Sequence, residues 1–309
     1  MIDWQSPNCT EHGAAQRHAC DSGRYVAMPW ASYIDATHGS SCAAPPAAHQ
    51  NIDKKISSHP VHTVCQHVYW KEALSWWEAA GITDVWLSHA AESGSRPGST
   101  NADSCATSNH PPRVHAWPLH AVNVETRSRS DGLVIGKNPR TKQYLASFIG
   151  AFMPHYLTDS RCRLELHEKN PAFFIRITGD AWHFDKVESY HPDTDARAKE
   201  QHEAIRLYNE VLSESVFALC PAGAGRNTIR LWEALAVGAV PVLVDEPPAF
   251  PEGPSLPQID WTQIVIQLTP EDIPDLPRIL RTFSFEEISE RRRLAMEAYR
   301  HIRDMRCFV

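Results

Sequence analysis

Segments typical of strands and of helices alternate along most of this 309-residue chain, and this order constrains the fold more than any other feature. Residues 62–67 (HTVCQH) read as a strand, 71–80 (KEALSWWEAA) as a helix closed by Gly81, and 82–87 (ITDVWL) as the next strand. Further strands are predicted at 24–29, 114–122, 143–149, 172–177, 216–220, 240–244 and 264–268, and further helices at 158–169, 201–213, 227–237, 270–282 and 285–303. Strands that alternate with helices form βαβ units, so the predicted class is α/β with mainly parallel sheets.

The chain is long enough for two domains of ordinary size. Charged and polar residues cluster between 125 and 145, where we place the boundary. We therefore expect a polar leader over 1–22, an N-terminal domain over 23–140 and a C-terminal domain over 141–309. Three stretches without periodicity are expected to be loops that shape a binding pocket: 36–60, 91–112 and 185–200.

Charge and composition exclude several classes of protein. Thirty Lys and Arg stand against 37 Asp and Glu, a net charge of −7 that gives no support to a nucleic-acid binder. No run approaches the roughly 18 apolar residues of a membrane span, and residues 1–23 lack the apolar core of a secretory signal. The eight cysteines are scattered without CxxC pairs, as is typical of reduced thiols, so we expect a cytoplasmic enzyme.

The first residues of the chain carry side chains of metal-binding type. They are Cys9, His12, His18 and Cys20. Their types could ligate a metal ion, but a loosely ordered leader is the favoured interpretation.

The segment 216–246 carries the clearest chemistry. Its strand is stopped by Pro221, and Gly223 and Gly225 permit unusual backbone angles and the close approach of a ligand. The next helix is predicted to begin near Asn227–Thr228, where unpaired N–H groups and the positive end of the helix dipole favour an anion. Ligands bind at this carboxyl edge of parallel sheets, so the segment predicts a phosphate site.

Three charged residues strengthen this prediction. Arg226 and Arg230 lie at the loop and on the first helical turn, where a guanidinium can fork onto phosphate oxygens. Glu233 shares a helix face with Arg230, and it either accepts hydrogen bonds from a ribose or pairs with that arginine. The Gly-x-Gly spacing is weak evidence, because neither a Walker A loop nor a dinucleotide fingerprint is present and an ordinary strand–helix turn stays open.

Residues 215–246 (SVFALCPAGAGRNTIRLWEALAVGAVPVLVDE), with Asp260–Trp261 and the helix after Pro270, closely resemble the exostosin-like glycosyltransferases of family 47. Upstream, QYLASFIGAF and the following Arg161 resemble that family's Phe–Gly strand end and helix arginine. The stretch TVCQHVYWKEALSWWEAAGITDVWLSHA looks like bacterial members associated with surface polysaccharide. The resemblance covers 143–283 and, less closely, 61–90.

This resemblance implies a GT-B-type arrangement, in which two Rossmann-like domains face a cleft and the C-terminal one holds a nucleotide-sugar donor. It implies inverting transfer to a glycan acceptor, with no metal and no cofactor beyond the donor, and with peripheral contact to membrane-bound polysaccharide machinery. By matching position, Gly150 and Arg161 flank the diphosphate, Glu233 meets the ribose, and Asp245 and Glu246 meet the sugar. The remaining donor-binding residues implied are Gly223, Gly225, Arg226, Asn227, Thr228 and Arg230.

Inversion requires a base that takes the acceptor's proton on the side opposite the leaving group. His89 is our first candidate and Glu72 the second, followed by His67, with Asp84 also in this region. The histidines end predicted strands and titrate near neutrality, although either can instead be a structural residue. His183 is expected to line the cleft or to pack in the core, and most tryptophans are expected to be core.

Two other functions stay open from the sequence. A nucleotide-sugar-modifying enzyme, an epimerase or dehydrogenase, would need a full dinucleotide fingerprint near the N-terminus, and none occurs. A non-catalytic module that binds a nucleotide or a carbohydrate would need the anion site but no base.

Overall fold

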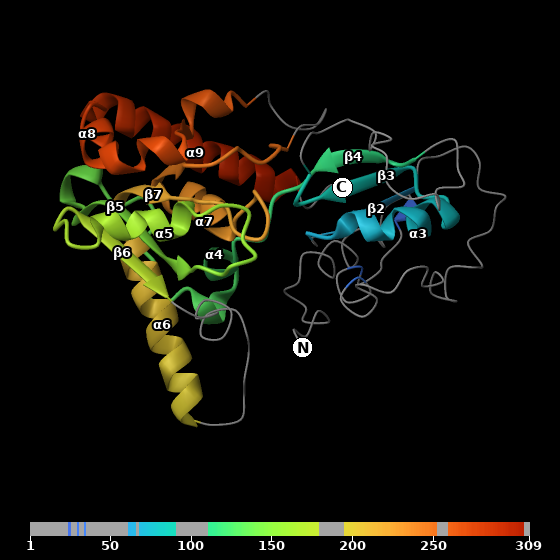
Figure 1. Cartoon of the computed structure of the whole chain (residues 1–309), viewed down its shortest axis with the longest axis horizontal. Helices are drawn as coiled ribbons and strands as arrows, with labels where there is room; N and C mark the ends of the chain where they lie inside the picture. Colours follow the sequence, from blue (N-terminus) through green and yellow to red (C-terminus); the bar gives the residue numbers. More distant parts are fainter. Residues whose placement is uncertain are drawn as a thin grey trace.

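A computed structural model describes residues 24–25, 30, 34, 61–65, 68–90, 111–178, 195–251 and 259–305. These residues form two separate sheets, both entirely parallel (Figure 1). The first sheet has the order β1-β2-β3-β4 and consists of β1 (Arg24–Tyr25), β2 (Val61–Cys65), β3 (Asp84–Leu87) and β4 (Arg113–Ala116). The second has the order β6-β5-β7-β8-β9 and consists of β5 (Tyr144–Ala151), β6 (Phe173–Thr178), β7 (Ser215–Leu219), β8 (Val240–Leu243) and β9 (Ile266–Gln267). The predicted α/β class with parallel sheets is confirmed, and the chain changes sheet between Ala116 and Tyr144.

The helices predicted from the sequence occur in the predicted order. The strand predicted at 114–122 ends at Ala116, however, and Val122–Glu125 forms a short helix that was not predicted. The α-helices are α3 (Leu74–Ala79), α4 (Val122–Glu125), α5 (Ser160–Arg163), α6 (Asp195–Ser213), α7 (Ile229–Val237), α8 (Leu276–Leu280) and α9 (Phe285–Met305). The 3-10 helices are η2 (Trp70–Ala73), η3 (Arg127–Arg129), η4 (Pro139–Thr141), η5 (Leu164–His167), η7 (Trp261–Gln263) and η8 (Pro270–Asp275). In the described part of the chain, none of the helices has the length and apolar character that crossing a bilayer demands.

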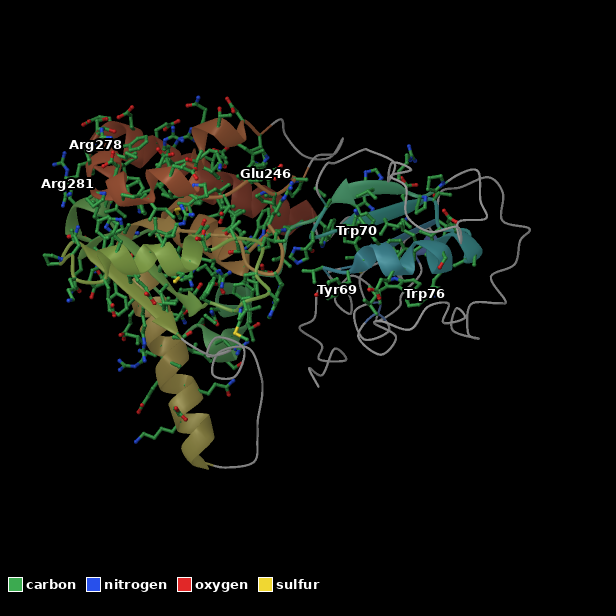
Figure 2. All side chains as sticks on the ribbon, in the orientation of Figure 1. Tyr69, Trp70, Trp76, Glu246, Arg278 and Arg281 are labelled. Carbon is green, nitrogen blue, oxygen red and sulfur yellow. The ribbon has the colours of Figure 1, made fainter. Side chains whose placement is uncertain are left out.

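Tryptophan side chains build the core beside the first sheet. The indole of Trp77 is fully buried, meets Trp30 edge-on at 5.9 Å and stacks on Trp70 at 6.4 Å. Trp30 also donates a 2.7 Å hydrogen bond from Nε1 to Thr63 Oγ1 on β2. Figure 2 shows Trp70 and Trp76 on the helical segment that covers this sheet. The expectation that most tryptophans are core residues is thus met here.

Asp84, at the start of β3, is a buried carboxylate with three donors. Thr83 Oγ1 donates to it over 2.8 Å, Arg113 Nη2 lies 3.0 Å from its Oδ1, and His115 Nε2 lies 2.7 Å from Oδ1. Burial raises the pKa of Asp84, but the hydrogen bonds from His115, Thr83 and Arg113 outweigh burial and leave the pKa below its usual value. Asp84 lies at the amino end of its strand, away from the carboxyl edge where a catalytic base was sought.

Replacing Asp84 with asparagine should therefore lower the free energy of unfolding by about 1–3 kcal/mol at neutral pH. Because the folded-state pKa is depressed, the stability that the carboxylate contributes is present above pH ~4 and is lost as the pH falls through the folded pKa. Denaturant unfolding of both proteins from pH 7 to pH 3 should show the difference shrinking in acid. A difference that is constant with pH would contradict this role of the carboxylate.

The second sheet is covered on both faces. Helices α6, α7 and α9 pack on one face through residues that include Tyr208, Leu235 and Ala298. On the other face α5, η5, η8 and α8 pack against strand residues such as Phe148 and Phe217. The α5–η5 connection from β5 to β6 and the α7 connection from β7 to β8 thus lie on opposite faces. This reversal makes the space between the carboxyl ends of β5 and β7 the topological switch point, where ligands bind in such sheets.

Candidate functional site

The loop of residues 221–228 leaves β7 at the switch point and leads into α7. Helix α7 begins at Ile229, two residues later than predicted, with Thr228 as its N-cap. The Thr228 side chain makes no capping hydrogen bond, and of the first-turn N–H groups that of Leu231 donates to Thr228 O over 3.1 Å. The N–H groups of Ile229 and Arg230 are therefore the donors that an anion would meet at this helix start. The loop and helix start lie at the end of a parallel strand, where the sequence predicts a phosphate site.

Arg161, on α5, bridges the ends of β5 and β7. Its Nε donates to Ala222 O over 2.8 Å, and its Nη1 donates to Ala151 O over 3.0 Å. Tyr156 supports the guanidinium, whose central carbon lies 4.7 Å from the centre of that ring. A Cβ at Gly223 would lie 2.7 Å from Arg161 Nη2, so any larger residue would force this guanidinium to shift.

Arg230 reaches the end of β5 from the other direction. Its guanidinium is buried, donates from Nη2 to Ile149 O, and lies between the rings of Phe148 and Tyr208 at 4.6 and 4.9 Å. Gly150, the predicted flank of a diphosphate, directly follows the accepting carbonyl. The two arginines therefore hold cationic charge on both sides of the switch point.

Glu233 is completely buried one turn further along α7. Its Oε1 accepts a 3.0 Å hydrogen bond from Asn123 N, and its Oε2 accepts a 2.6 Å hydrogen bond from Tyr208. Burial raises the pKa of Glu233, although these hydrogen bonds and the nearby Arg230 oppose the rise. Because Glu233 is completely buried and both carboxylate oxygens have partners within the protein, a contact with ribose would require the side chains around Glu233 to move.

The loop is braced from the β8 side by two acidic residues. Asp245 is buried and accepts hydrogen bonds of 2.6 Å from Ser160 Oγ and 2.7 Å from Ala222 N. Glu246 is exposed and forms an ion pair with Arg226 at the rim. In Figure 2 Glu246 lies on the side of this unit that faces the first sheet, whereas Arg278 and Arg281 lie on the opposite side. Sequence reasoning missed Ser160 and Tyr208, because a lone serine or a helix tyrosine carries no motif.

The structure brings His89 from the first sheet onto this loop. His89 follows β3, and a Cβ at Gly225 would lie 2.3 Å from its Nδ1, so the imidazole occupies the space that glycine leaves open. Glu72 lies on η2 with an exposed side chain, while His67 and His183 lie outside the described residues. Of the base candidates, His89 is the residue that the described structure places against the predicted phosphate loop.

Gly223 and Gly225 do not have the unusual backbone angles predicted from the sequence. Among the described glycines, positive φ occurs at Gly81, Gly132, Gly136 and Gly238, so that expectation is wrong. These two glycines instead admit the Arg161 and His89 side chains.

The four metal-type residues of the leader lie outside the described residues. Within the ranges that the structure describes, no group of three or more His, Cys, Asp or Glu is placed to hold a metal ion.

Comparison with protein families gives one clear match. The model of the Exostosin GT47 domain matches residues 98–283, more than half of the chain. The Exostosin-1 homolog of Caenorhabditis elegans is 26% identical over 188 residues, which cover 61% of this chain and 47% of that protein. Over 87 residues, or 28% of this chain, the probable glucuronosyltransferase 47 A of Physcomitrium patens is 32% identical and the probable beta-1,4-xylosyltransferase IRX10 of Arabidopsis thaliana 31% identical. The chain matches 19% and 20% of those two proteins, so it spans less than half the length of each of these relatives.

Solved structures add little. The pneumococcal O-GlcNAc transferase GtfA in complex with UDP and GlcNAc aligns with 94% of this chain and 48% of that one, at 12% identity and a TM-score of 0.38. No functional conclusion follows from a likeness of that degree.

Proposed function

Because this chain belongs to the exostosin GT47 family, we propose that it is an inverting glycosyltransferase that moves a sugar from a nucleotide-diphosphate sugar onto a hydroxyl of a glycan acceptor. The observation that carries the proposal is the switch point of the second sheet, where Arg161 holds the end of β5 and the loop after β7, and Arg230 on the first turn of α7 holds the end of β5. Cleavage of the donor puts negative charge on the β-phosphate. Fixed N–H groups and guanidinium groups are the donors that stabilise such a charge without a metal.

In this proposal the first sheet with its helices supplies the base, and the second sheet with its helices holds the donor. His89 takes the proton from the acceptor hydroxyl as its oxygen attacks the anomeric carbon, and the bond from that carbon to the phosphate oxygen breaks. The electron pair leaves with the nucleoside diphosphate, held by the 221–228 loop with Arg226 at its rim. His89 afterwards releases the proton to solvent. We propose that Asp245 holds the loop in place and that Glu246 faces the transferred sugar.

For the finer assignment we propose a UDP-sugar donor with a hexosyl, uronosyl or pentosyl group, and a role in surface or capsular polysaccharide synthesis. A relative named as a probable glucuronosyltransferase supports a uronosyl group, and one named as a probable xylosyltransferase supports a pentosyl group. A cytoplasmic protein at the periphery of membrane-bound polysaccharide machinery would fit this role.

The test is nucleotide release from a panel of UDP-sugars, measured with and without glycan acceptors. A transferase should release UDP from one donor at a rate that rises with acceptor concentration, and the product should have the opposite anomeric configuration. Binding of UDP without release on any donor would instead indicate a non-catalytic module. Chemical change of the donor sugar without transfer would indicate a sugar-modifying enzyme.

Replacing Arg230 with alanine should weaken UDP binding by about 1.5–3 kcal/mol, roughly 10- to 150-fold in Kd, because a charge-assisted hydrogen bond to the diphosphate is lost. Calorimetric titration with UDP measures this loss. Thermal unfolding checks that the variant is folded, since Arg230 also holds the end of β5. Arg206→Ala is the matched control, because Arg206 is an exposed arginine paired with Glu210 on α6. A folded Arg230→Ala protein with unchanged UDP affinity would remove Arg230 from the donor site.

Chelation tests the proposal that the leaving group needs no metal. Turnover should be unchanged after treatment with EDTA. The sequence does contain one Asp-x-Asp triplet, Asp193–Thr194–Asp195, the arrangement that can bridge a metal ion and a diphosphate, and its side chains lie outside those described. Two results together would assign the leaving-group chemistry to a metal at this triplet. The wild-type protein would lose activity on chelation and regain it with manganese or magnesium, and an Asp193→Asn, Asp195→Asn variant would have no activity that either metal restores.

A further inference from the structure

The side chain of Asn227 connects the two sheets. Its Nδ2 donates a 2.6 Å hydrogen bond to Ser88 O and a longer one, 3.4 Å, to Trp117 O. Ser88 directly follows β3 and Trp117 directly follows β4, so both carbonyls lie at the carboxyl edge of the first sheet. The Asn227 Oδ1 accepts a 2.7 Å hydrogen bond from Nε1 of the fully buried Trp232 on α7. All these bonds are within the protein, and Asn227 is only 4% exposed.

This bridge lies beside the contact between His89 and Gly225. Ser88 directly precedes His89, and Gly225 lies two residues before Asn227. The hydrogen bond between Asn227 and Ser88 is therefore within two residues of the contact between His89 and Gly225 on each side. Trp117 N also donates to Leu87 O over 2.9 Å, which ties the ends of β3 and β4 to each other. Any loss of the Asn227 hydrogen bonds therefore acts directly on the distance between His89 and the 221–228 loop.

We propose that Asn227 is a positioning residue that holds His89 in register with the donor loop, and that its side chain is not a ligand of the donor phosphates. The inference rests on the proposed function for the roles of His89 and the loop. The chemistry requires a carboxamide at this position, because both amide hydrogens face backbone carbonyls while the oxygen faces an indole N–H. An aspartate has the same shape but presents an ionised oxygen to the two carbonyls.

Asn227→Asp is the decisive variant, and the chain offers a matched control. Asn209 is also fully buried and also donates from Nδ2 to two backbone carbonyls, those of Arg129 and Asp131, both over 2.8 Å. It lies on α6 and does not connect the two sheets. Asn209→Asp therefore reproduces the electrostatic cost of a buried carboxylate without disturbing His89. Asn227→Ser keeps one donor and replaces the aspartate variant if the latter does not fold.

Hydrogen–deuterium exchange read by mass spectrometry tests the bridge without any need for turnover. Asn227→Asp should increase exchange in peptides that contain residues 84–90 and 221–228, whereas Asn209→Asp should increase it around residues 127–133 only. Unchanged exchange at 84–90 in the Asn227 variant would overturn the inference, whether or not the protein transfers sugar.

Kinetics then separates positioning from donor binding. Asn227→Asp should lower kcat on the order of 10- to 100-fold, the effect of a misplaced catalytic group, while the Kd for UDP stays unchanged. The kcat deficit should shrink as the pH is lowered, because a protonated aspartate can again donate to Ser88 O. A parallel loss of UDP affinity with no change in exchange would make Asn227 a donor ligand and overturn the inference. A wild-type protein that shows no transfer on any donor would refute the proposed function, while the exchange result would still decide whether the bridge exists.

Discussion

Replacement of Trp232 by alanine should lower the free energy of unfolding by about 3–5 kcal/mol, the usual cost of emptying a large buried aromatic site. Trp232 is fully buried in α7 and meets Trp261 edge-on at 6.2 Å. Its indole N–H is also a hydrogen-bond partner of Asn227, whose carbonyl oxygen would be left buried without it. The loss therefore combines a cavity at α7 with an unsatisfied polar atom in the preceding 221–228 loop.

Denaturant unfolding measures this effect as a lower midpoint at an unchanged slope. Trp232→Phe should lose less than the alanine variant, because it keeps most of the ring volume. Tyr69→Ala, at a side chain that is 46% exposed (Figure 2), should stay within about 0.5 kcal/mol of the wild type. A loss below about 1 kcal/mol in Trp232→Ala would show that the site refills and that the packing argument is wrong.

The second large effect is expected at His89. His89→Gln should lower turnover on the order of 100-fold or more, the usual contribution of proton transfer by a positioned base, while UDP binding stays intact. The physical reason is position, since the imidazole lies directly against Gly225 in the loop that is proposed to hold the donor. Steady-state kinetics on the donor found in the panel, together with UDP calorimetry, measures both quantities.

Two further variants sharpen this test. Glu72→Gln should keep most of the activity, because Glu72 is exposed on η2, whereas a large loss there with a mild His89→Gln effect would make Glu72 the base. In Gly225→Ala the added methyl group would lie 2.3 Å from His89 Nδ1, so the ring must move and turnover should fall. If His89→Gln and Glu72→Gln both keep near-normal turnover, the base lies elsewhere and the assignment is to be dropped.

The amino-acid pattern was sufficient for the order and type of most elements, although the short helix Val122–Glu125 was not predicted. Strand β8 was predicted at 240–244 and runs over Val240–Leu243, because four consecutive buried residues produce a strong local signal. Helix α6 was predicted from 201, yet it begins at Asp195 and projects from the body in Figure 1. Its first six residues, DARAKE, include no large apolar residue, so they carry no apolar periodicity from which a helix start could be predicted. Helices and strands can thus be predicted from the sequence where buried apolar residues form a run or recur at regular spacing along the chain.

The tertiary structure decided what those elements bring together. The order β6-β5-β7-β8-β9 places the ends of β5 and β7 side by side, and Arg161 spans them through backbone carbonyls that have no sequence signature. The Asn227–Ser88 hydrogen bond joins residues 139 positions apart, and the Asn123–Glu233 bond joins residues 110 positions apart. A residue type and its neighbours in the chain specify local conformation and burial, whereas a hydrogen bond at such separation exists only after the elements that carry the two residues have packed together. For this reason the 221–228 loop could be singled out from the sequence as a candidate phosphate site, but the partners of Glu233, the side chains that Gly223 and Gly225 admit and the bridge at Asn227 could not be predicted.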